Sequence, residues 1–563
     1  MISRQLILES QMHLRAMQFL PLLIAIAACS DPDSPPPEAA MSVDDAFATV
    51  TRENIEAHLK FLAADERRGR FTGSPEYLES AQYVADQFAS LGLEPAGTDG
   101  WFQPVQFMVN QIDIERSGVT MHQEDGDAVL KWKENYIMGG DKVRAQTEVT
   151  GEVVFAGYGV HAPEIGYSDY DGIDVEGKIV AMFFGAPSSF PHNERAYYSS
   201  GRTKNEELVK RGAIGAIGLR DRVGMKRFSW ERMTLNAGVI PGMGWMDDVG
   251  DVADHHHEIR GSALFNELTA TELFASSLIS FEEALDAADR NEPSSTPLGI
   301  EVTLQRETGH HEISSPNVVG LLRGSDPELA DEYIVYTAHL DHLGVATPVD
   351  GDDIYNGFYD NAMGSALLIE MARAMAAMPE APRRSILFVA VTGEERGLLG
   401  SDYFAQNPPV DIDSIVANVN LDMPLLLFPI ADVVAFGAAH SSLIEPARAA
   451  VEAEGFTLSP DPAPEEVRFI RSDQYSFVRQ GVPALFVVPG SQSTDPDIDG
   501  GAIVRDHRQN HYHKPTDDFT RPLDWDSAIR FARANVRLGL NIASADERPT
   551  WNEGDFFGDK FGR

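Results

Sequence analysis

The sequence has a single cysteine, Cys29, among 563 residues, so a disulfide within the chain is excluded. Positive charge is also scarce, because 45 lysines and arginines stand against 87 aspartates and glutamates, for a formal net charge of −42 at pH 7. Nucleic-acid binding depends on a basic surface, so this balance argues against a nucleic-acid partner. It favours solubility and a weak attraction to cationic peptide amines, which salt would screen.

Long apolar runs and phosphate-binding loops are missing as well. No run reaches the roughly 18 apolar residues that a membrane-spanning helix needs. The GYG at 157–159 lacks the remainder of a nucleotide-binding fingerprint, and no internal repeat is evident. The length exceeds what one hydrophobic core supports, so we expect about two or three domains.

The first 28 residues have the pattern of a secretory signal. The apolar stretch 19–29 (FLPLLIAIAAC) is too short to span a membrane, and Ile26-Ala27-Ala28-Cys29 resembles the bacterial lipobox. We expect Cys29 to carry lipid and to place the chain at the bacterial cell envelope, on its periplasmic or outer-membrane face. Ordinary signal cleavage near Ala28 would instead give a secreted protein. The lipid would be the only membrane attachment, and the oligomeric state stays open.

The sequence contains five polar segments with possible metal ligands, and the first four follow or flank short apolar runs. The runs 333–338, 385–391, 415–421 and 483–489 are rich in Val, Ile and Phe, as strands buried on both faces are. The stretch 364–378 has helical spacing of apolar residues. This alternation predicts an α/β fold with a mixed sheet flanked by helices, whose ligands bind beyond the carboxyl ends of the strands. The polar segments are TAHLDHLG (337–344), YDNAMGSA (359–366), TGEERGLLGS (392–401), VNLDMP (419–424) and HYHKPTDD (511–518).

These segments offer the nitrogen and oxygen ligands that zinc prefers. We predict two zinc ions per chain, with Asp360 as the bridging carboxylate. The remaining predicted ligands are Glu395 and His513 for one zinc, and His339 and Asp422 for the other.

Two further acids have predicted roles at this site. Glu394 is then free to act as general base, taking a proton from water and passing it to the leaving amine. Asp341 is expected to orient the His339 imidazole. His511 competes with His513 for the place of the last ligand.

The same segments resemble the di-zinc aminopeptidase family that includes aminopeptidase Y and plasma glutamate carboxypeptidase, with glutaminyl cyclases and the transferrin receptor as distant members. The resemblance covers about residues 50–110 and 300–545, and it favours His513 over His511. A further family segment, S-D-x-x-x-F, occurs at 472–477, but Gln474 stands where the family often has histidine. The matching steps are His339-Leu340-Asp341, Asp360-Asn361, Glu394-Glu395, Asp422 and Tyr512-His513-Lys514-Pro515-Thr516-Asp517.

A strand, strand, helix, strand series at 149–220 resembles the protease-associated domain that such peptidases often carry before their first metal ligand. His255-His256-His257 is interpreted as an exposed loop rather than a second metal site. The expected organisation is a signal (1–28), a Pro-rich acidic tether (29–45), the first part of the catalytic domain (46–129), a smaller inserted α/β protease-associated domain (130–300), the second catalytic part (301–545) and a tail (546–563).

The resemblance implies an exported zinc aminopeptidase that removes N-terminal residues from peptides. A carboxypeptidase or dipeptidase of the same fold would need a cationic clamp, for which Arg468, Arg471 and Arg505 are candidates. The same scaffold also fits a glutaminyl cyclase-like acyltransferase, which works with one zinc, or a non-catalytic binding protein.

Overall fold

The computed structural model describes residues 42–124 and 126–563. The predicted signal, Cys29 with its expected lipid, and most of the expected tether therefore lie outside the described residues. Within the described ranges, no helix has both the length and the apolarity needed to cross a membrane.

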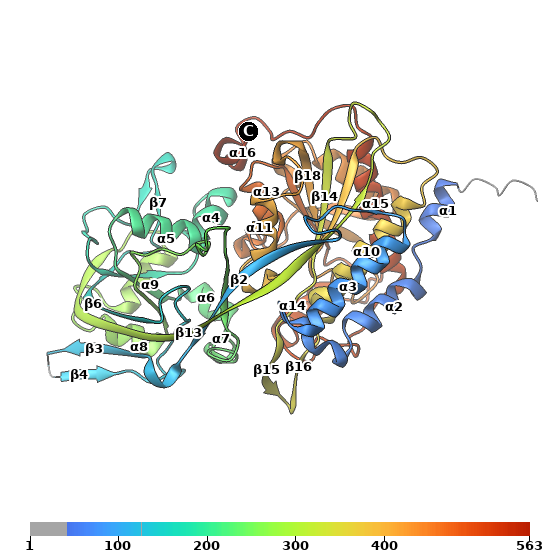
Figure 1. Ribbon diagram of the computed structural model, residues 1–563. Coiled ribbons are helices and arrows are strands. Elements are labelled where there is room, and N and C mark those ends of the chain that lie inside the picture. The colour runs from blue at the N-terminus through green and yellow to red at the C-terminus, as the bar shows by residue number, and fades with distance from the viewer. Residues whose placement is uncertain (1–41, 125) are drawn as a thin grey trace, which may run out of the picture. The chain divides into compact units, whose positions relative to one another are not determined.

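The segment that contains the predicted ligands is built on a mixed sheet whose central strands are parallel (Figure 1). β14 (Tyr333–His339) pairs in parallel with β17 (Ser385–Val391) and with β18 (Ile415–Asn420), and β18 pairs in parallel with β21 (Ala484–Pro489). Every residue of β17 and β18 is buried, as expected for Val- and Ile-rich strands covered on both faces. These strands confirm the four apolar runs predicted as strands.

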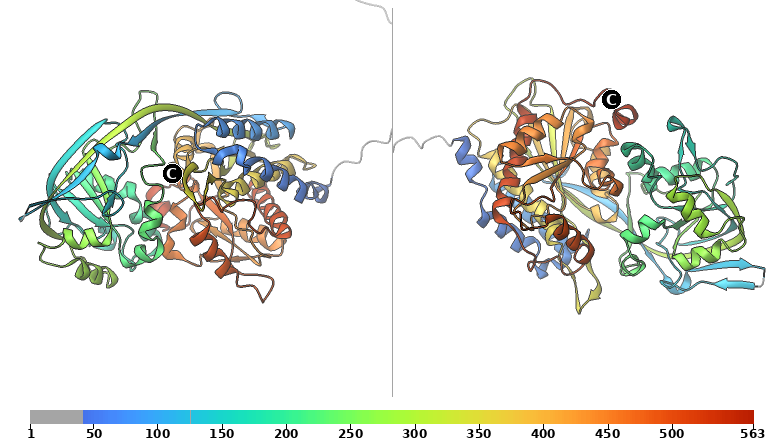
Figure 2. Two further views of the ribbon diagram at one scale, coloured as in Figure 1. Left: turned by 90° about the horizontal axis from the view of Figure 1, so that it is seen from below. Right: turned by 180° about the vertical axis from the view of Figure 1, so that it is seen from behind.

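Helices cover both faces of this sheet (Figure 2). One face packs against α2 (Arg52–Leu62), α3 (Pro75–Ser90), α10 (Met363–Ala376), α12 (Ile444–Ala453) and α15 (Trp525–Ser544). The other packs against α11 (Leu399–Gln406), α13 (Gln474–Val478) and α16 (Phe556–Phe561). The predicted α/β fold with a mixed sheet between helices is confirmed.

One long strand, β13 (Thr296–Leu322), joins this sheet to a second one. Its last residues pair with β17, its middle pairs with β2 (Phe102–Ile112), and its first half pairs with β3 (Gly118–Gln123) and β6 (Gln146–Phe155). All of these pairings are antiparallel, so the two sheets share one continuous backbone ladder.

The second sheet has hydrophobic cores of its own. Its parallel centre is β6, β9 (Ile179–Phe183), β10 (Gly215–Leu219) and β12 (Gly261–Phe265). The helices along this segment are α4 (His192–Ser199), α5 (Gly201–Lys210), α6 (Arg222–Arg227), α7 (Trp230–Thr234), α8 (Glu267–Leu273) and α9 (Phe281–Asp289).

The remaining elements are short or peripheral. In the tail, Phe557 of α16 is fully buried against Phe469 and His440. The other helices and strands are α1 (Val43–Ala48), α14 (Gly500–Asn510), β1 (Glu94–Pro95), β4 (Gly126–Val129), β5 (Tyr136–Ile137), β7 (His161–Ala162), β8 (Tyr167–Ser168), β11 (Gly242–Trp245), β15 (Gly344–Val349), β16 (Asp352–Tyr355), β19 (Asp432–Phe436) and β20 (Thr457–Ser459).

Candidate metal centre

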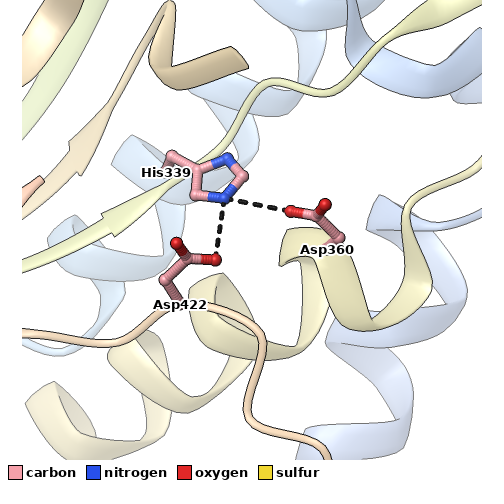
Figure 3. Close-up of side chains that lie close together, drawn as sticks. All are labelled: His339, Asp360 and Asp422. Atoms are coloured by element: carbon pink, nitrogen blue, oxygen red, sulfur yellow. Dashed lines mark hydrogen bonds and ion pairs between the residues drawn. The ribbon is translucent and has the colours of Figure 1, made fainter. Parts of the chain in front are cut away.

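The neighbouring parallel strands β14 and β18 end side by side, and the first two candidate ligands lie at these ends. His339 is the last residue of β14, and Asp422 follows β18. His339 Nε2 lies 3.2 Å from Asp422 Oδ1 and 3.2 Å from Asp360 Oδ1 (Figure 3). All three side chains are buried, so the nitrogen and the two carboxylate oxygens face one another away from bulk water.

Asp360 lies between two groups of candidate ligands. Its Oδ1 faces His339, and its Oδ2 lies 3.2 Å from His513 Nε2. The Asp517 carboxylate holds the backbone of this turn by accepting the N–H groups of Tyr359 and Asp360. One carboxylate that presents an oxygen to each of two histidines has the arrangement that a bridging metal ligand needs.

Glu395 and two histidines form the second group. Glu395 Oε2 lies 3.1 Å from His513 Nε2, and Glu395 Oε1 lies 2.8 Å from His342 Nδ1. With one ligand atom per residue, the compact groups found among the described residues are His339–Asp360–Asp422 and His342–Asp360–Glu395. Sequence reasoning gave His342 no role, although it is fully buried beside the site.

The spacing of these donors fits zinc. Ligand nitrogen and oxygen atoms lie about 2.0–2.2 Å from a tetrahedral zinc, which puts two ligands of one ion roughly 3.3–3.5 Å apart. The nitrogen–oxygen separations of 3.1–3.2 Å around Asp360 are close to that value. Glu395 Oε1 and His342 Nδ1 are also buried and lie 2.8 Å apart without the geometry of a hydrogen bond, an arrangement that a bound cation would stabilise.

The surroundings keep these carboxylates ionised, as metal ligands must be. Burial raises the pKa of Asp360, but hydrogen bonds from His339 and His513 outweigh burial and hold its pKa below the usual value. Burial likewise raises the pKa of Glu395, whereas the nearby His513 and His342 bring it well below its usual range.

Asp341 fixes the loop that carries the glutamate pair. Its carboxylate accepts the backbone N–H groups of Glu394 (3.1 Å) and Glu395 (3.3 Å) and the hydroxyl of Thr72. Its contact with His339 is made instead by the main-chain carbonyl, 3.1 Å from Nδ1, while the carboxylate is 4.0 Å away. The Asp341 side chain therefore positions the Glu394–Glu395 backbone more directly than it orients the imidazole.

The Glu394 side chain is half-buried and electrostatically coupled to the site. Burial raises the pKa of Glu394 well above its usual value; Asp422 and Glu395 add to this effect, and His339 opposes it. Bound cations would lower the pKa again. A carboxyl group in this setting can accept and return a proton.

A chain of hydrogen bonds supports Asp422 from behind. Ser472 donates to Asp422 Oδ2 at 2.6 Å, and Asn420 donates both to the Ser472 hydroxyl and to Gln474 Oε1. Gln474 is fully buried and also donates to the Phe469 carbonyl. Gln474 thus serves as an internal support in this chain.

Arg70 supports the loops on either side of Asp360, and sequence reasoning did not single it out. The side chain is fully buried and donates to four backbone carbonyls, those of Leu62, Leu340, Asn356 and Gly357. Leu340 follows His339, and Gly357 lies three residues before Asp360, so one guanidinium connects both ligand loops. Its segment, DERRGR, has the composition of an exposed charged loop, which hid this role.

The other histidines and arginines considered as candidates lie elsewhere. The His511 ring bonds Thr516 and Arg521. Arg468 pairs with Glu466 at 2.5 Å, whereas Arg471 and Arg505 are exposed. His255 and His256 are half-buried rather than exposed, because the Arg144 side chain packs against their loop through carbonyls including that of His256.

Comparison with known proteins places this site in a peptidase context. Residues 317–538, which include all five predicted ligands, match the model of peptidase family M28. The chain is 26% identical over 250 residues to a probable zinc metalloprotease of Pyrenophora teres f. teres, covering 42% of this chain and 50% of that protein. It is 31% identical over 112 residues to aminopeptidase YwaD of Bacillus subtilis, covering 20% and 22%.

A longer match is 25% identical over 415 residues to a glutamate carboxypeptidase 2 homolog of Caenorhabditis elegans, covering 63% of this chain and 49% of that protein. The chain thus spans half or less of the length of these relatives. Among solved structures, an aminopeptidase from Aneurinibacillus sp. strain AM-1 shares the fold with a TM-score of 0.52 at 18% identity, covering 90% and 97% of the two chains. The resemblance inferred from the motifs is confirmed.

Proposed function

We propose that the chain is a zinc-dependent aminopeptidase that removes N-terminal residues from peptides, starting from the match of residues 317–538 to the model of peptidase family M28. The observation that carries the proposal is the Asp360 carboxylate, whose two oxygens each lie 3.2 Å from a different histidine. This geometry supports a two-metal centre, and the relatives named as zinc metalloprotease and aminopeptidase support the reaction.

Two zinc ions per chain are proposed, with the ligand sets predicted from the sequence. His339 and Asp422 would hold one ion, Glu395 and His513 would hold the other, and Asp360 would contribute to both sets. When bound, zinc supplies Lewis acidity that polarises a peptide carbonyl and lowers the pKa of water. We assign His342 to the support of Glu395, because its ring lies beside Glu395 Oε1 while His513 faces Glu395 Oε2.

Glu394 is the proposed general base. Its backbone N–H is held by the Asp341 carboxylate, and its side chain feels the charges of His339 and Asp422. Glu394 accepts a proton from the attacking water and returns it to the amine that leaves when the peptide bond breaks. Proton transfer of this kind requires that Glu394 itself be free of metal, which the assignment of Glu395 as ligand allows.

The location and the inserted domain are proposed from sequence alone. We propose that the chain is exported and anchored at the cell envelope through lipid on Cys29. The segment 130–300 is proposed to be a protease-associated domain, and the hydrophobic cores that lie mostly within it, with contributions from residues 112–121 and 302–304, support this proposal.

Metal counting combined with one substitution tests the catalytic proposal. The purified protein should contain two zinc ions by elemental analysis and should hydrolyse aminoacyl anilides until a chelator removes them. Glu394→Gln keeps the shape but removes the proton acceptor, so turnover should fall by about 10²–10⁴ with zinc content unchanged. Turnover within tenfold of the parent would place the base elsewhere, and a single zinc would favour a cyclase-like acyltransferase.

A further inference from the structure

A pocket of about 240 Å³ opens next to the second group of ligands. Its wall includes His513 itself, Arg396, which follows Glu395, and Leu343, which follows His342. Arg232 and Lys514 add two further basic groups, Asn236 and Tyr512 are its neutral polar residues, and no aspartate or glutamate lines it. A pocket whose charged lining is entirely basic is unexpected in a chain with a net charge of −42.

Arg232 reaches the pocket from α7, outside the catalytic sheet. Its guanidinium donates to the backbone carbonyls of Arg508 (2.8 Å) and Tyr512 (3.4 Å) and lies 5.2 Å from the centre of the Tyr512 ring. The Tyr512 ring in turn stacks on His513, with 3.8 Å between ring centres. The Tyr512 ring therefore lies between the Arg232 guanidinium and the ring of His513, a candidate zinc ligand.

Arg396 reaches the same pocket from the catalytic side. Its Nε is buried without a hydrogen-bond partner among the described residues, and its terminal nitrogen donates only to the Pro241 carbonyl, at 3.4 Å. The nearby acids Glu394 and Glu395 would be engaged with zinc and with proton transfer in the working enzyme. Arginine does not lose its proton in proteins, so the charge of Arg396 remains available to a ligand.

The cations of this pocket have no acidic partner of their own. In residues 42–124 and 126–563, Arg232, Arg396 and Lys514 form no salt bridge, and their hydrogen bonds go to backbone carbonyls. Both arginines are half-buried, so their charge is incompletely solvated at a cost in free energy. An incoming anion would compensate that cost, and the planar guanidinium group matches a carboxylate in shape.

We propose that this pocket binds a carboxylate of the peptide substrate and so gives the enzyme a preference for acidic substrates. The inference rests on the proposed peptidase function and names its substrate class. The carboxylate has two sources: the free C-terminus of a short peptide, or the side chain of an aspartate or glutamate near the scissile bond. Arg232 and Arg396 are the specificity-determining residues.

Matched peptides separate the two sources. The ratio of kcat/KM for alanyl-alanine to that for its C-terminal amide measures the contribution of the terminal carboxylate. The ratio for glutamyl-alanine amide to glutaminyl-alanine amide measures the contribution of the side-chain carboxylate. In at least one pair, kcat/KM should favour the carboxylate by about tenfold or more, since hydrogen bonds to charged groups contribute about 1.5–3 kcal/mol. Equal or lower kcat/KM for the carboxylate in both pairs would overturn the proposal while leaving the peptidase function intact.

Variants connect the preference to the pocket. Arg232→Gln and Arg396→Gln should each reduce the preference by about tenfold or more, with zinc content measured in parallel. Arg505→Gln, an equal change of charge at an exposed position of α14, is the control and should retain it. If both pocket variants keep the parent's preference with full zinc, the carboxylate binds elsewhere and the inference is wrong.

A binding measurement stands apart from catalysis. Calorimetric titration of the zinc-loaded protein with glutarate and with its neutral diamide should show tighter binding of glutarate. The Arg396→Gln variant should lose about tenfold of that affinity, and Arg505→Gln should lose none. Glutarate affinity that is unchanged in Arg396→Gln and Arg232→Gln would refute the pocket. Hydrolysis of no peptide at all, alongside arginine-dependent glutarate binding, would refute the peptidase function alone.

Discussion

Replacing Arg70 by methionine removes a side chain that connects the loop after His339 to the loop before Asp360. The guanidinium is fully buried and donates to the carbonyls of Leu62, Leu340, Asn356 and Gly357. Methionine fills much of the same volume but offers no donor, so all four carbonyls lose their partner. The change therefore separates hydrogen bonding from packing.

The expected loss of stability follows from two opposing terms. Hydrogen bonds to a charged group contribute about 1.5–3 kcal/mol each, or roughly 6–12 kcal/mol for four. Against this, burial lowers the pKa of Arg70 to about 10, which corresponds to a penalty of about 3 kcal/mol on the charged form. We expect Arg70→Met to lower the free energy of unfolding by at least about 3 kcal/mol.

Metal affinity should fall as well, because Leu340 and Gly357 position His339 and Asp360. Loss of a partner behind a metal ligand typically weakens binding by about 10–100-fold. Urea unfolding of the metal-free protein measures the first effect, and competition with a chromogenic chelator measures the second. Arg70→Lys has a single ammonium group in place of the guanidinium. Its stability and its zinc affinity should both lie between those of the parent and those of Arg70→Met.

Arg67→Gln is the matched control for the Arg70 variants. Arg67 lies in the same short segment but pairs with the exposed Glu79, so its loss should cost about 0–1 kcal/mol. The proposed role of Arg70 would be wrong if the free energy of unfolding of Arg70→Met were within about 1 kcal/mol of the parent's and its zinc affinity within threefold.

Three further predictions test the ligand assignment and the anchor. Asp360→Asn and Glu395→Gln should lose zinc together with activity and unfold at lower temperature, because bound metal favours the folded state; two tight zinc ions in either variant would exclude that residue as a ligand. His513→Ala should abolish activity while His511→Ala leaves much of it, and the opposite ranking would reverse the assignment. Cys29→Ser should move the protein out of the membrane fraction or leave an unprocessed precursor, whereas a native chain that starts at Cys29 without acyl mass by intact-mass measurement would rule out the lipoprotein.

The catalytic sheet could be predicted because its strands are continuous apolar runs. Such runs arise because both faces of each strand are buried, and this can be recognised from the sequence alone. The clustering of His339 and Asp422 followed from the rule that parallel strands end at one edge of a sheet. Contacts made by backbone atoms could not be foreseen in this way. The Asp341 carboxylate binds two N–H groups of another loop, an arrangement that no residue spacing encodes.

His342 and Arg70 escaped prediction for a related reason. His342 lies one position beyond the H-x-D step, and only the folded loop turns its ring back toward Glu395. Arg70 belongs to a short stretch with three arginines, of which it alone is fully buried, and its partners are carbonyls up to 287 residues away. Sequence patterns identify apolar burial well, but they do not show which charged side chain the fold encloses.

The position of the long strand β13 in the chain determines the order in which the partners of the two sheets are synthesised. Its partners β2 and β6 precede it in the chain, whereas β17 follows it, so the second sheet can pair while the catalytic sheet still lacks its centre. Chains emerge from the ribosome N-terminus first, and His513 leaves after β14, β17, β18 and β21. The second group of ligands is therefore completed only near the end of synthesis. A zinc ion held by Glu395 and His513, as proposed, therefore cannot have its full ligand set before nearly the whole catalytic sheet has been synthesised.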